Sequence, residues 1–455
     1  MGLTSQALRR GLGSVGCGTW LALTATGAAS AQPRQLTLAE TLATAAAHQP
    51  QIRAARAAEQ AARARTSMAQ TGYLPRVEAQ AQYQRSTANF VLSPAFANSP
   101  FASSLNIQNK LGPADTVNYF LFGATASETL FDFGRTRAAV IGSEAAADAA
   151  AADTDNSAES VALAVRTAYF NTLAAHELVV LADETVANQR KHVAQAAQFV
   201  QVGTRPKIDL SSAELVLANA ELGLVRARNG ESTARLQLAS AMGVEARTIA
   251  NVALAPATID PLPEEDLPGD RIGEDAVKNR PEYRRATAQM RAQEAEDGSI
   301  RSAYLPALVA VGNVSGTKVG EFGAGFNWYV GLGLNWNLSA AVLAGRQLAE
   351  SNAQLESVAA ARESLRLGIV TEVDQQLLAV REAKERLTVA DRAIRTAAER
   401  RELAEVRYRA GASEILELDD AQVMEANIKA QRVQGQYDLA IARARLVRAM
   451  GRKKL

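Results

Sequence analysis

The strongest constraint on the fold of this chain is an internal duplication. Residues of one half recur in the other at one of two displacements. Pro50 and residues 73–75 recur 231 residues later, at Pro281 and residues 304–306. Gly203 and residues 242–243 recur 208 residues later, at Gly411 and residues 450–451. Self-similarity of this kind indicates repeated structural units. The sequence therefore predicts two halves of similar plan, each with a helix, a β-hairpin, a very long helix and a final helix.

A proline-rich segment separates the two halves. Residues 256–270 hold four prolines, which the interior of a helix does not tolerate. We therefore assign the first structural repeat to residues 32–250, a linker to residues 251–271 and the second repeat to residues 272–455.

Both long helices carry an apolar repeat of seven residues. In the first half it consists of Val165, Thr172, Val179, Val186, Val193 and Val200, interleaved with Ala168, Ala175, Ala182 and Ala196; in the second half of Val373, Val380, Leu387 and Ile394, with Ala383, Ala390, Ala397 and Ala404. This pattern forms the seam of a coiled coil. Helices over 135–202 and 340–410 would each reach on the order of 100 Å. So long a repeat, present twice, predicts an elongated bundle or tube.

The strands are predicted from a period of two. From Phe322 to Leu338 every even-numbered residue is apolar, whereas the odd positions hold mainly glycine and asparagine. Both a membrane barrel strand and a strand of a soluble sandwich show this alternation. Residues 305–317 can pair with this strand through a tight turn at 318–321. Residues 74–91 and 117–133 form the matching hairpin of the first half, joined by a long loop.

Four strands cannot close a barrel, because about eight strands is the practical minimum. An open sheet in lipid would also leave the polar groups of its edges unpaired. Three copies of the chain would supply twelve strands. The predicted fold class is therefore an α+β membrane protein. In it a trimer forms one transmembrane β-barrel, with four strands per chain, above a long antiparallel α-helical coiled-coil barrel.

Residues 1–31 have the pattern of an export signal. Arg9 and Arg10 precede a weakly apolar stretch, and residues 29–31 (Ala-Ser-Ala) form a cleavage pattern of small residues, so the mature chain is predicted to start at Gln32. Lipid attachment at Cys17 is the alternative, but Ser14 stands where an aliphatic residue is preferred. Beyond this segment the sequence has no run of 18 apolar residues.

Composition and motifs exclude several classes of function. Lys plus Arg number 49 and Asp plus Glu number 48, so no basic field is available for nucleic acid. The three histidines, His48, His176 and His192, lack the spacing of metal ligands. The sequence has no P-loop and no G-x-S-x-G elbow. We therefore expect no enzyme activity, no catalytic residue, no metal and no cofactor.

The order of these features resembles the TolC family of outer-membrane channels. The resemblance rests on the duplicated plan, the Tyr-Leu-Pro start of each hairpin, the segment Phe131-Asp132-Phe133-Gly134-Arg135, and the acid that follows both Gly203 and Gly411 by six residues. Residues 337–341 (Asn-Leu-Ser-Ala-Ala) depart from the aromatic residue and paired glycines usual in the family.

The resemblance implies a homotrimer in outer-membrane lipid, with a periplasmic extension. It also implies docking with a periplasmic adaptor (membrane fusion protein) and with an inner-membrane ABC or proton-driven pump. The assembly would be an exit duct for proteins in type I secretion, or for small toxic compounds in efflux. The alternative is a soluble periplasmic coiled-coil adaptor or scaffold, which would explain the helices but not the strand at 322–338.

In that family the turns between glycine and acid form the periplasmic tips, where the tube narrows to an aperture. By position, Asp209 follows Gly203, and Glu417 and then Asp420 follow Gly411. Glu417 and Asp420 are three residues apart and share a helix face, which in a trimer predicts two stacked acidic rings. Asp209 and Glu417 also lie near helix starts, where a carboxylate stabilises the helix without any further role.

Two more aperture residues follow from the resemblance. Tyr408 lies three residues before Gly411, as the aperture tyrosine of the family does. The aperture arginine of the family would fall at Ser413, which is a departure. Arg205 lies two residues after Gly203 and is the candidate replacement.

Overall fold

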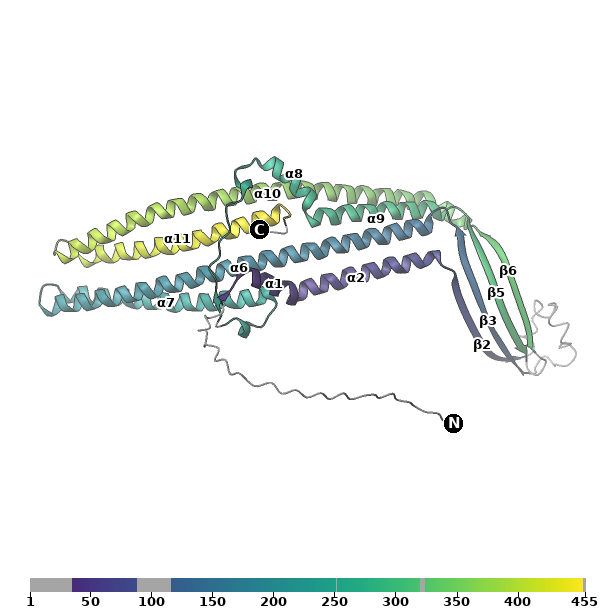
Figure 1. Cartoon of the computed structure of the whole chain (residues 1–455), viewed down its shortest axis with the longest axis horizontal. Helices are drawn as coiled ribbons and strands as arrows, with labels where there is room; N and C mark the ends of the chain where they lie inside the picture. The colour runs from purple at the N-terminus through teal and green to yellow at the C-terminus, as the bar shows by residue number, and fades with distance from the viewer. Residues whose placement is uncertain (1–34, 88–115, 251, 320–323, 453–455) are drawn as a thin grey trace, which may run out of the picture.

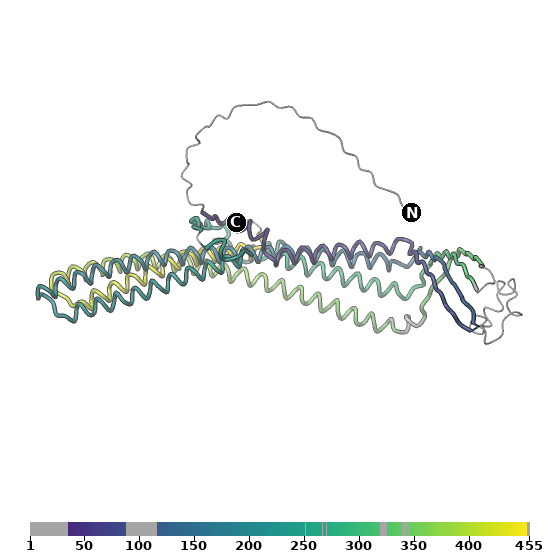
Figure 2. The backbone as a smooth tube through the Cα atoms, turned by 90° about the horizontal axis from the view of Figure 1, so that it is seen from below, coloured from purple at the N-terminus to yellow at the C-terminus, as the bar shows by residue number. Residues whose placement is uncertain are grey.

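The computed structural model describes residues 35–87, 116–250, 252–319 and 324–452. The predicted signal segment, most of the predicted loop between the strands at 74–91 and 117–133, and residues 320–321 of the predicted turn at 318–321 lie outside the described residues. Residues 318–319 of that turn belong to a strand instead. The chain is elongated: the helices run along one axis, and the strands stand together at one end (Figure 1). A view at right angles shows the strands leaving at an angle to the helices (Figure 2).

The two halves repeat one order of elements. The first half contains α1 (Leu38–His48), α2 (Pro50–Gln70), β2 (Arg76–Thr87), β3 (Thr116–Phe131), α6 (Arg135–Gln201) and α7 (Lys207–Met242). The second contains α8 (Gly269–Asn279), α9 (Pro281–Ala303), β5 (Ala307–Val319), β6 (Ala324–Asn335), α10 (Leu338–Arg409) and α11 (Ile415–Ala449). The first helix of each half is therefore two helices, where the sequence pattern predicts one.

The duplicated prolines cause this break. Pro50 and Pro281 each occupy the first position of a helix, and the preceding residues, Gln49 and Arg280, are extended, with ψ angles of 119° and 132°. Proline disfavours helical geometry in the residue before it, and its missing N–H costs nothing at a helix start. The chain therefore changes direction at the same place in each half.

The duplicated glycines at the ends of α7 and α11 pack against these breaks. Gly243 has a φ of +71°, and a Cβ atom there would lie 2.8 Å from the Cα of Gln49. Gly451 has a φ of +69°, and a Cβ atom there would lie 3.0 Å from the backbone nitrogen of Arg280. Only glycine combines a left-handed backbone with so close an approach of another chain segment. Each half therefore has one junction, at which its repeated glycine (Gly243 or Gly451) packs against the break before its repeated proline (Pro50 or Pro281).

The four long strands form one antiparallel sheet in the order β2-β3-β5-β6. The alternation of β6 divides the sheet into an apolar and a more polar face, with Val330 78% exposed on the former and Tyr329 55% exposed on the latter. Gly316 leaves space on β5 for the ring of Phe122, which lies across it. The outer strands β2 and β6 each have one edge that pairs with no other described strand.

The segment between the halves is packed rather than extended. β1 (Gln35–Leu36) pairs in parallel with β4 (Ala253–Leu254), and a short 3-10 helix, η4 (Pro263–Asp266), follows. Glu265 of η4 is buried and binds Arg443 of α11, at 2.8 Å, and Lys384 of α10. Helix α8 begins at Gly269, inside the predicted linker, because Pro268 stands just outside the helix and needs no N–H there.

Helices α6 and α7 form one hairpin and α10 and α11 the other, and α6 packs against α11 between them. The predicted seam is buried at Val165, Thr172, Val179, Val186, Val373 and Val380, while Leu387, Ala390 and Ile394 stay partly exposed. One core cluster joins Tyr169 and Phe170 of α6 to Tyr437 of α11. Within the described ranges, every helix is too short or too polar to span a membrane.

Candidate functional site at the helical tips

The two hairpins end in turns of the same geometry. In the first, the N–H groups of Gly203 and Thr204 donate to the carbonyls of Val200 and Phe199, at 3.1 and 3.0 Å. In the second, Gly411 and Ala412 bond in the same way to the carbonyls of Tyr408 and Arg407. Gly203 and Gly411 have φ angles of +74° and +75°. This is the Schellman motif, in which a left-handed glycine satisfies the last carbonyls of a helix.

Arg205 joins the first tip to the second. Its Nη2 donates to the carbonyls of Tyr408, at 2.7 Å, and Ser413, at 3.2 Å. Its guanidinium carbon lies 4.6 Å from the centre of the Tyr408 ring, within the range of a cation–π contact. The family pattern would place an arginine at position 413, where this chain has a serine. Here Arg205 of the other turn supplies the guanidinium and bonds the carbonyl of Ser413.

Tyr408 and Asp209 meet in the core between the tips. They are 4% and 6% exposed, and the Tyr408 hydroxyl donates to Oδ2 of Asp209 at 3.4 Å. Burial, together with the charge of Asp209, raises the pKa of the Tyr408 hydroxyl, so the phenol stays protonated and donates. Asp209 lies in the first turn of α7, but no side chain caps that helix by a hydrogen bond. Its carboxylate is turned toward the other hairpin.

Glu417 and Asp420 have different surroundings. Oε1 of Glu417 lies 2.9 Å from Nη1 of Arg407 in an exposed pair within the second hairpin. Asp420 lines a groove of about 460 Å³ between α7 and α11, beside the apolar side chains of Leu215 and Leu416. Neither carboxylate caps α11 by a hydrogen bond. The structure brings Arg205, Tyr408 and Asp209 together, and Glu417 and Asp420 stand apart from them.

Asp419 is the residue of this site that sequence reasoning missed. Burial, and then the charges of Asp420 and Asp209, raise the pKa of its carboxyl to about 6. It lines the same groove as Asp420. Its place directly before Asp420 is a signal in the sequence, but only Glu417 and Asp420 were assigned from their positions after Gly411.

The site offers no arrangement for holding a metal. Across the described ranges, no group of three or more His, Cys, Asp or Glu side chains is placed to bind an ion. Arg205, Tyr408 and Asp209 form what we call the tip cluster. Its guanidinium, phenol and carboxylate make a reversible, non-covalent cross-link between the two hairpins.

Comparisons with known proteins identify the family. The model of the outer membrane efflux protein family matches residues 41–244 and 272–452. No curated protein matches the chain significantly in sequence. Among solved structures, the CmeC outer membrane channel of Campylobacter jejuni is 17% identical with a TM-score of 0.77, covering 91% of this chain and 85% of its own.

Two further structures share the fold. The outer membrane protein VceC of Vibrio cholerae is 16% identical with a TM-score of 0.78, covering 91% of this chain and 96% of its own. The open state of the MtrE outer membrane channel of Neisseria gonorrhoeae is 19% identical with a TM-score of 0.72, covering 91% and 89%. The resemblance to TolC-like channels and the predicted fold class are confirmed. The chain belongs to the outer membrane efflux protein family, whose members are channels of the outer membrane rather than enzymes.

Proposed function

We propose that three copies of this chain form a passive exit duct, which receives cargo from an inner-membrane pump through a periplasmic adaptor. The observation that carries this proposal is the open sheet. Its two edges, β2 and β6, run antiparallel to each other, so β6 of one copy can pair with β2 of the next without breaking the antiparallel order. Edge strands in lipid must be paired, because no water is present to bond their backbone groups.

The helical wall supports the same assembly. Ile208, Leu215, Leu222 and Leu236 of α7 are exposed, and the first three recur every seven residues. Leu378, Leu403 and Val406 of α10 are exposed as well. Within one chain α7 packs on α6 and α10 packs on α11, so α7 and α10 are the outer helices of the wall. A heptad stripe without a partner is expected to pack on a neighbouring helix.

The tips are the part of the duct that we expect to open and close. In the proposed trimer, three copies of the Arg205–Tyr408–Asp209 cross-link would surround the periplasmic entrance. The sequence has no P-loop, so we expect the driving force to come from the pump. Efflux of small toxic compounds is the cargo class that the family description favours; secretion of a protein through the same duct would be the other outcome.

The lipid-facing sheet gives a sharp test with a matched control. Val330 and Tyr329 are neighbours on β6 and point to opposite faces. An arginine on the lipid face of a barrel strand costs about 2–4 kcal/mol at mid-membrane, whereas the lumen tolerates charge. Val330→Arg should therefore reduce assembly of the trimer in the outer membrane, and Tyr329→Arg should not.

The measurement is the amount of cross-linked trimer in detergent-extracted outer membranes, together with accumulation of a fluorescent dye in cells that depend on this channel for efflux. Val330→Arg should lower the trimer yield and raise dye accumulation; Tyr329→Arg should match the wild type in both. A monomer in the periplasmic fraction, or equal effects of the two variants, would contradict the proposal. A lower trimer yield of Val330→Arg without a change in dye accumulation would point to a protein as cargo.

A further inference from the structure

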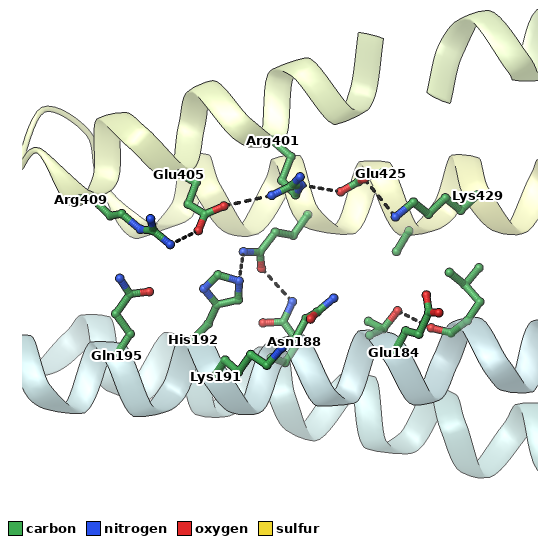
Figure 3. Close-up of a pocket in the computed structure, with 15 residues that line it drawn as sticks. Glu184, Asn188, Lys191, His192, Gln195, Arg401, Glu405, Arg409, Glu425 and Lys429 are labelled. Carbon is green, nitrogen blue, oxygen red and sulfur yellow. Dashed lines mark hydrogen bonds and ion pairs between the residues drawn. The ribbon is translucent and has the colours of Figure 1, made fainter. Parts of the chain in front are cut away.

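A second polar site joins the two hairpins farther from the tips. A groove of about 330 Å³ lies between α6 on one side and α10 and α11 on the other. Figure 3 shows its lining, with His192 reaching from α6 toward the side chains of the opposite hairpin. The tip cluster uses none of these residues.

A chain of hydrogen bonds crosses the groove. Nε2 of Gln189 donates to Oε1 of Gln422 at 2.8 Å, and Nε2 of Gln422 lies 2.8 Å from Nε2 of His192. Gln189 and Gln422 are 5% and 8% exposed, so water does not readily replace these bonds. An amide nitrogen only donates, so Nε2 of His192 must accept. The chain therefore requires a neutral imidazole with its hydrogen on Nδ1.

The charges around the groove cannot compensate a protonated His192. His192 faces charged residues of three helices: Arg401, Glu405 and Arg409 of α10, Glu425 and Lys429 of α11, and Glu184 and Lys191 of α6 itself. On the α7 side of α6, Arg190 pairs with Glu221.

The two acids of the opposite hairpin are already shared. Glu405 binds Arg401 and Arg409, and Glu425 binds Arg401 and Lys429. Burial lowers the pKa of His192; the charge of Glu405 raises it, the charges of Arg409, Arg401 and Lys191 lower it, and the net shift is downward. Protonation would also turn Nε2 of His192 into a donor that faces the donating nitrogen of Gln422. That conflict ends only if both buried amides rotate or if the hairpins separate.

We propose that the Gln189–Gln422–His192 chain is an acid-sensitive latch, which holds the two hairpins of each chain together while His192 is neutral and releases them when it is protonated. The proposal rests on the proposed function, because its consequence is a duct that opens more readily in acid. Because the pKa of His192 is lower in the packed groove than in water, the latch is fully effective above about pH 6.5, the ordinary histidine pKa, and is lost as the pH falls from there through the lowered pKa.

Asp419 titrates in the same range with the opposite sign. Its raised pKa means that protonation relieves its repulsion with Asp420 and Asp209 and favours the packed tips in acid. The pH response of the wild type is therefore a sum of two effects. The latch is isolated by comparing the wild type with a variant that removes only the histidine.

The experiment records channel opening of the full-length trimer in planar bilayers at about pH 7.5 and about pH 5.5, on either side of the ordinary histidine pKa. His192→Gln keeps a hydrogen-bonding side chain but does not titrate. His176→Gln is the matched control: His176 lies on the same helix, is exposed, and pairs at 3.0 Å with Glu231 of α7, outside the groove. His192→Gln should open as often as the wild type at the higher pH and less often at the lower pH.

At about pH 5.5, one unit below the ordinary histidine pKa, the expected difference is at most about tenfold, however far the groove depresses the pKa. His176→Gln should follow the wild type at both pH values. If His192→Gln and the wild type change in parallel between the two pH values, the latch does not exist. If the wild type conducts at neither pH value, the proposed function fails, and that outcome is distinct from failure of the latch.

A second measurement does not depend on conduction or on any variant. Deuterium exchange at the imidazole C2 position, followed by mass spectrometry, gives the pKa of each histidine in the intact trimer. The pKa of His192 should lie below the ordinary histidine value of about 6.5. A pKa of His192 at or above that value would overturn the proposal.

Discussion

Removing Arg205 should loosen the tips more than removing any other single charge there. In Arg205→Ala the chain loses two hydrogen bonds, to the carbonyls of Tyr408 and Ser413, and the contact over the Tyr408 ring. All three connect the first hairpin to the second. The Tyr408 carbonyl also accepts a hydrogen bond from the N–H of Gly411, so it keeps a partner when Arg205 is removed. The penalty is therefore mainly that of lost bonds.

The magnitude follows from these contacts. Two hydrogen bonds of ordinary net strength contribute about 1 kcal/mol each, and a cation–π contact at a partly exposed site contributes about 0.5–1 kcal/mol. Their sum, about 2–3 kcal/mol per chain, corresponds to a change of about 30- to 150-fold in the ratio of open to closed tips. Arg205→Lys should recover a part of this, because an ammonium keeps the charge but not the planar fork.

Single-channel recording in planar bilayers measures this ratio directly. Arg407→Ala is the matched control, since Arg407 lies beside the same tip but is 56% exposed and pairs with Glu417 of its own hairpin. An exposed pair contributes about 0–1 kcal/mol, so this variant should change the ratio by about fivefold at most. Equal effects of Arg205→Ala and Arg407→Ala would refute the view that the cross-hairpin contacts hold the tip closed.

Three further predictions test other parts of the structure. Gly243→Ala should lower the unfolding temperature more than Gly203→Ala, because a Cβ atom meets backbone at the first position and open space at the second; equal shifts would show that only the left-handed geometry matters. Ala383→Leu should destabilise the helical wall by about 1–3 kcal/mol through overpacking, measured by thermal unfolding, and unchanged stability would indicate a looser seam. Glu417→Ala combined with Asp420→Ala should reduce cation preference, read from the reversal potential in a salt gradient; an unchanged potential would place selectivity elsewhere.

The duplication made much of the fold predictable from the sequence. The period of seven was present in both halves, so both long helices followed directly. The period of two was identified in one strand, at 322–338, and the duplication then predicted a matching hairpin in the first half. The breaks before Pro50 and Pro281 were not predicted, although both prolines were noted as repeats. Their role became clear only when Gly243 was seen against Gln49, a contact between segments that local patterns do not connect.

The site was less predictable, because it depends on which side chains meet between hairpins. Position relative to Gly203 and Gly411 identified Asp209, Tyr408 and Arg205. It gave no reason for Glu417 to pair within its own hairpin, for Asp419 to be buried, or for His192 to face Gln422. Those contacts depend on the rotation of each helix about its axis, and a heptad pattern fixes that rotation only for the apolar seam.

The same duplication explains why the contacts of Arg205 with the second tip are asymmetric. Arg205 and Ser413 are equivalent positions of the two halves, since they are separated by the displacement that relates Gly203 to Gly411. Arg205 thus bonds the carbonyl of its own counterpart. Two symmetric arginines would place like charges at one junction, and the position equivalent to Tyr408 is Val200, which has no aromatic face to receive a guanidinium. One arginine in one turn and one tyrosine in the other is therefore an arrangement in which both halves contribute to a single contact between the tips.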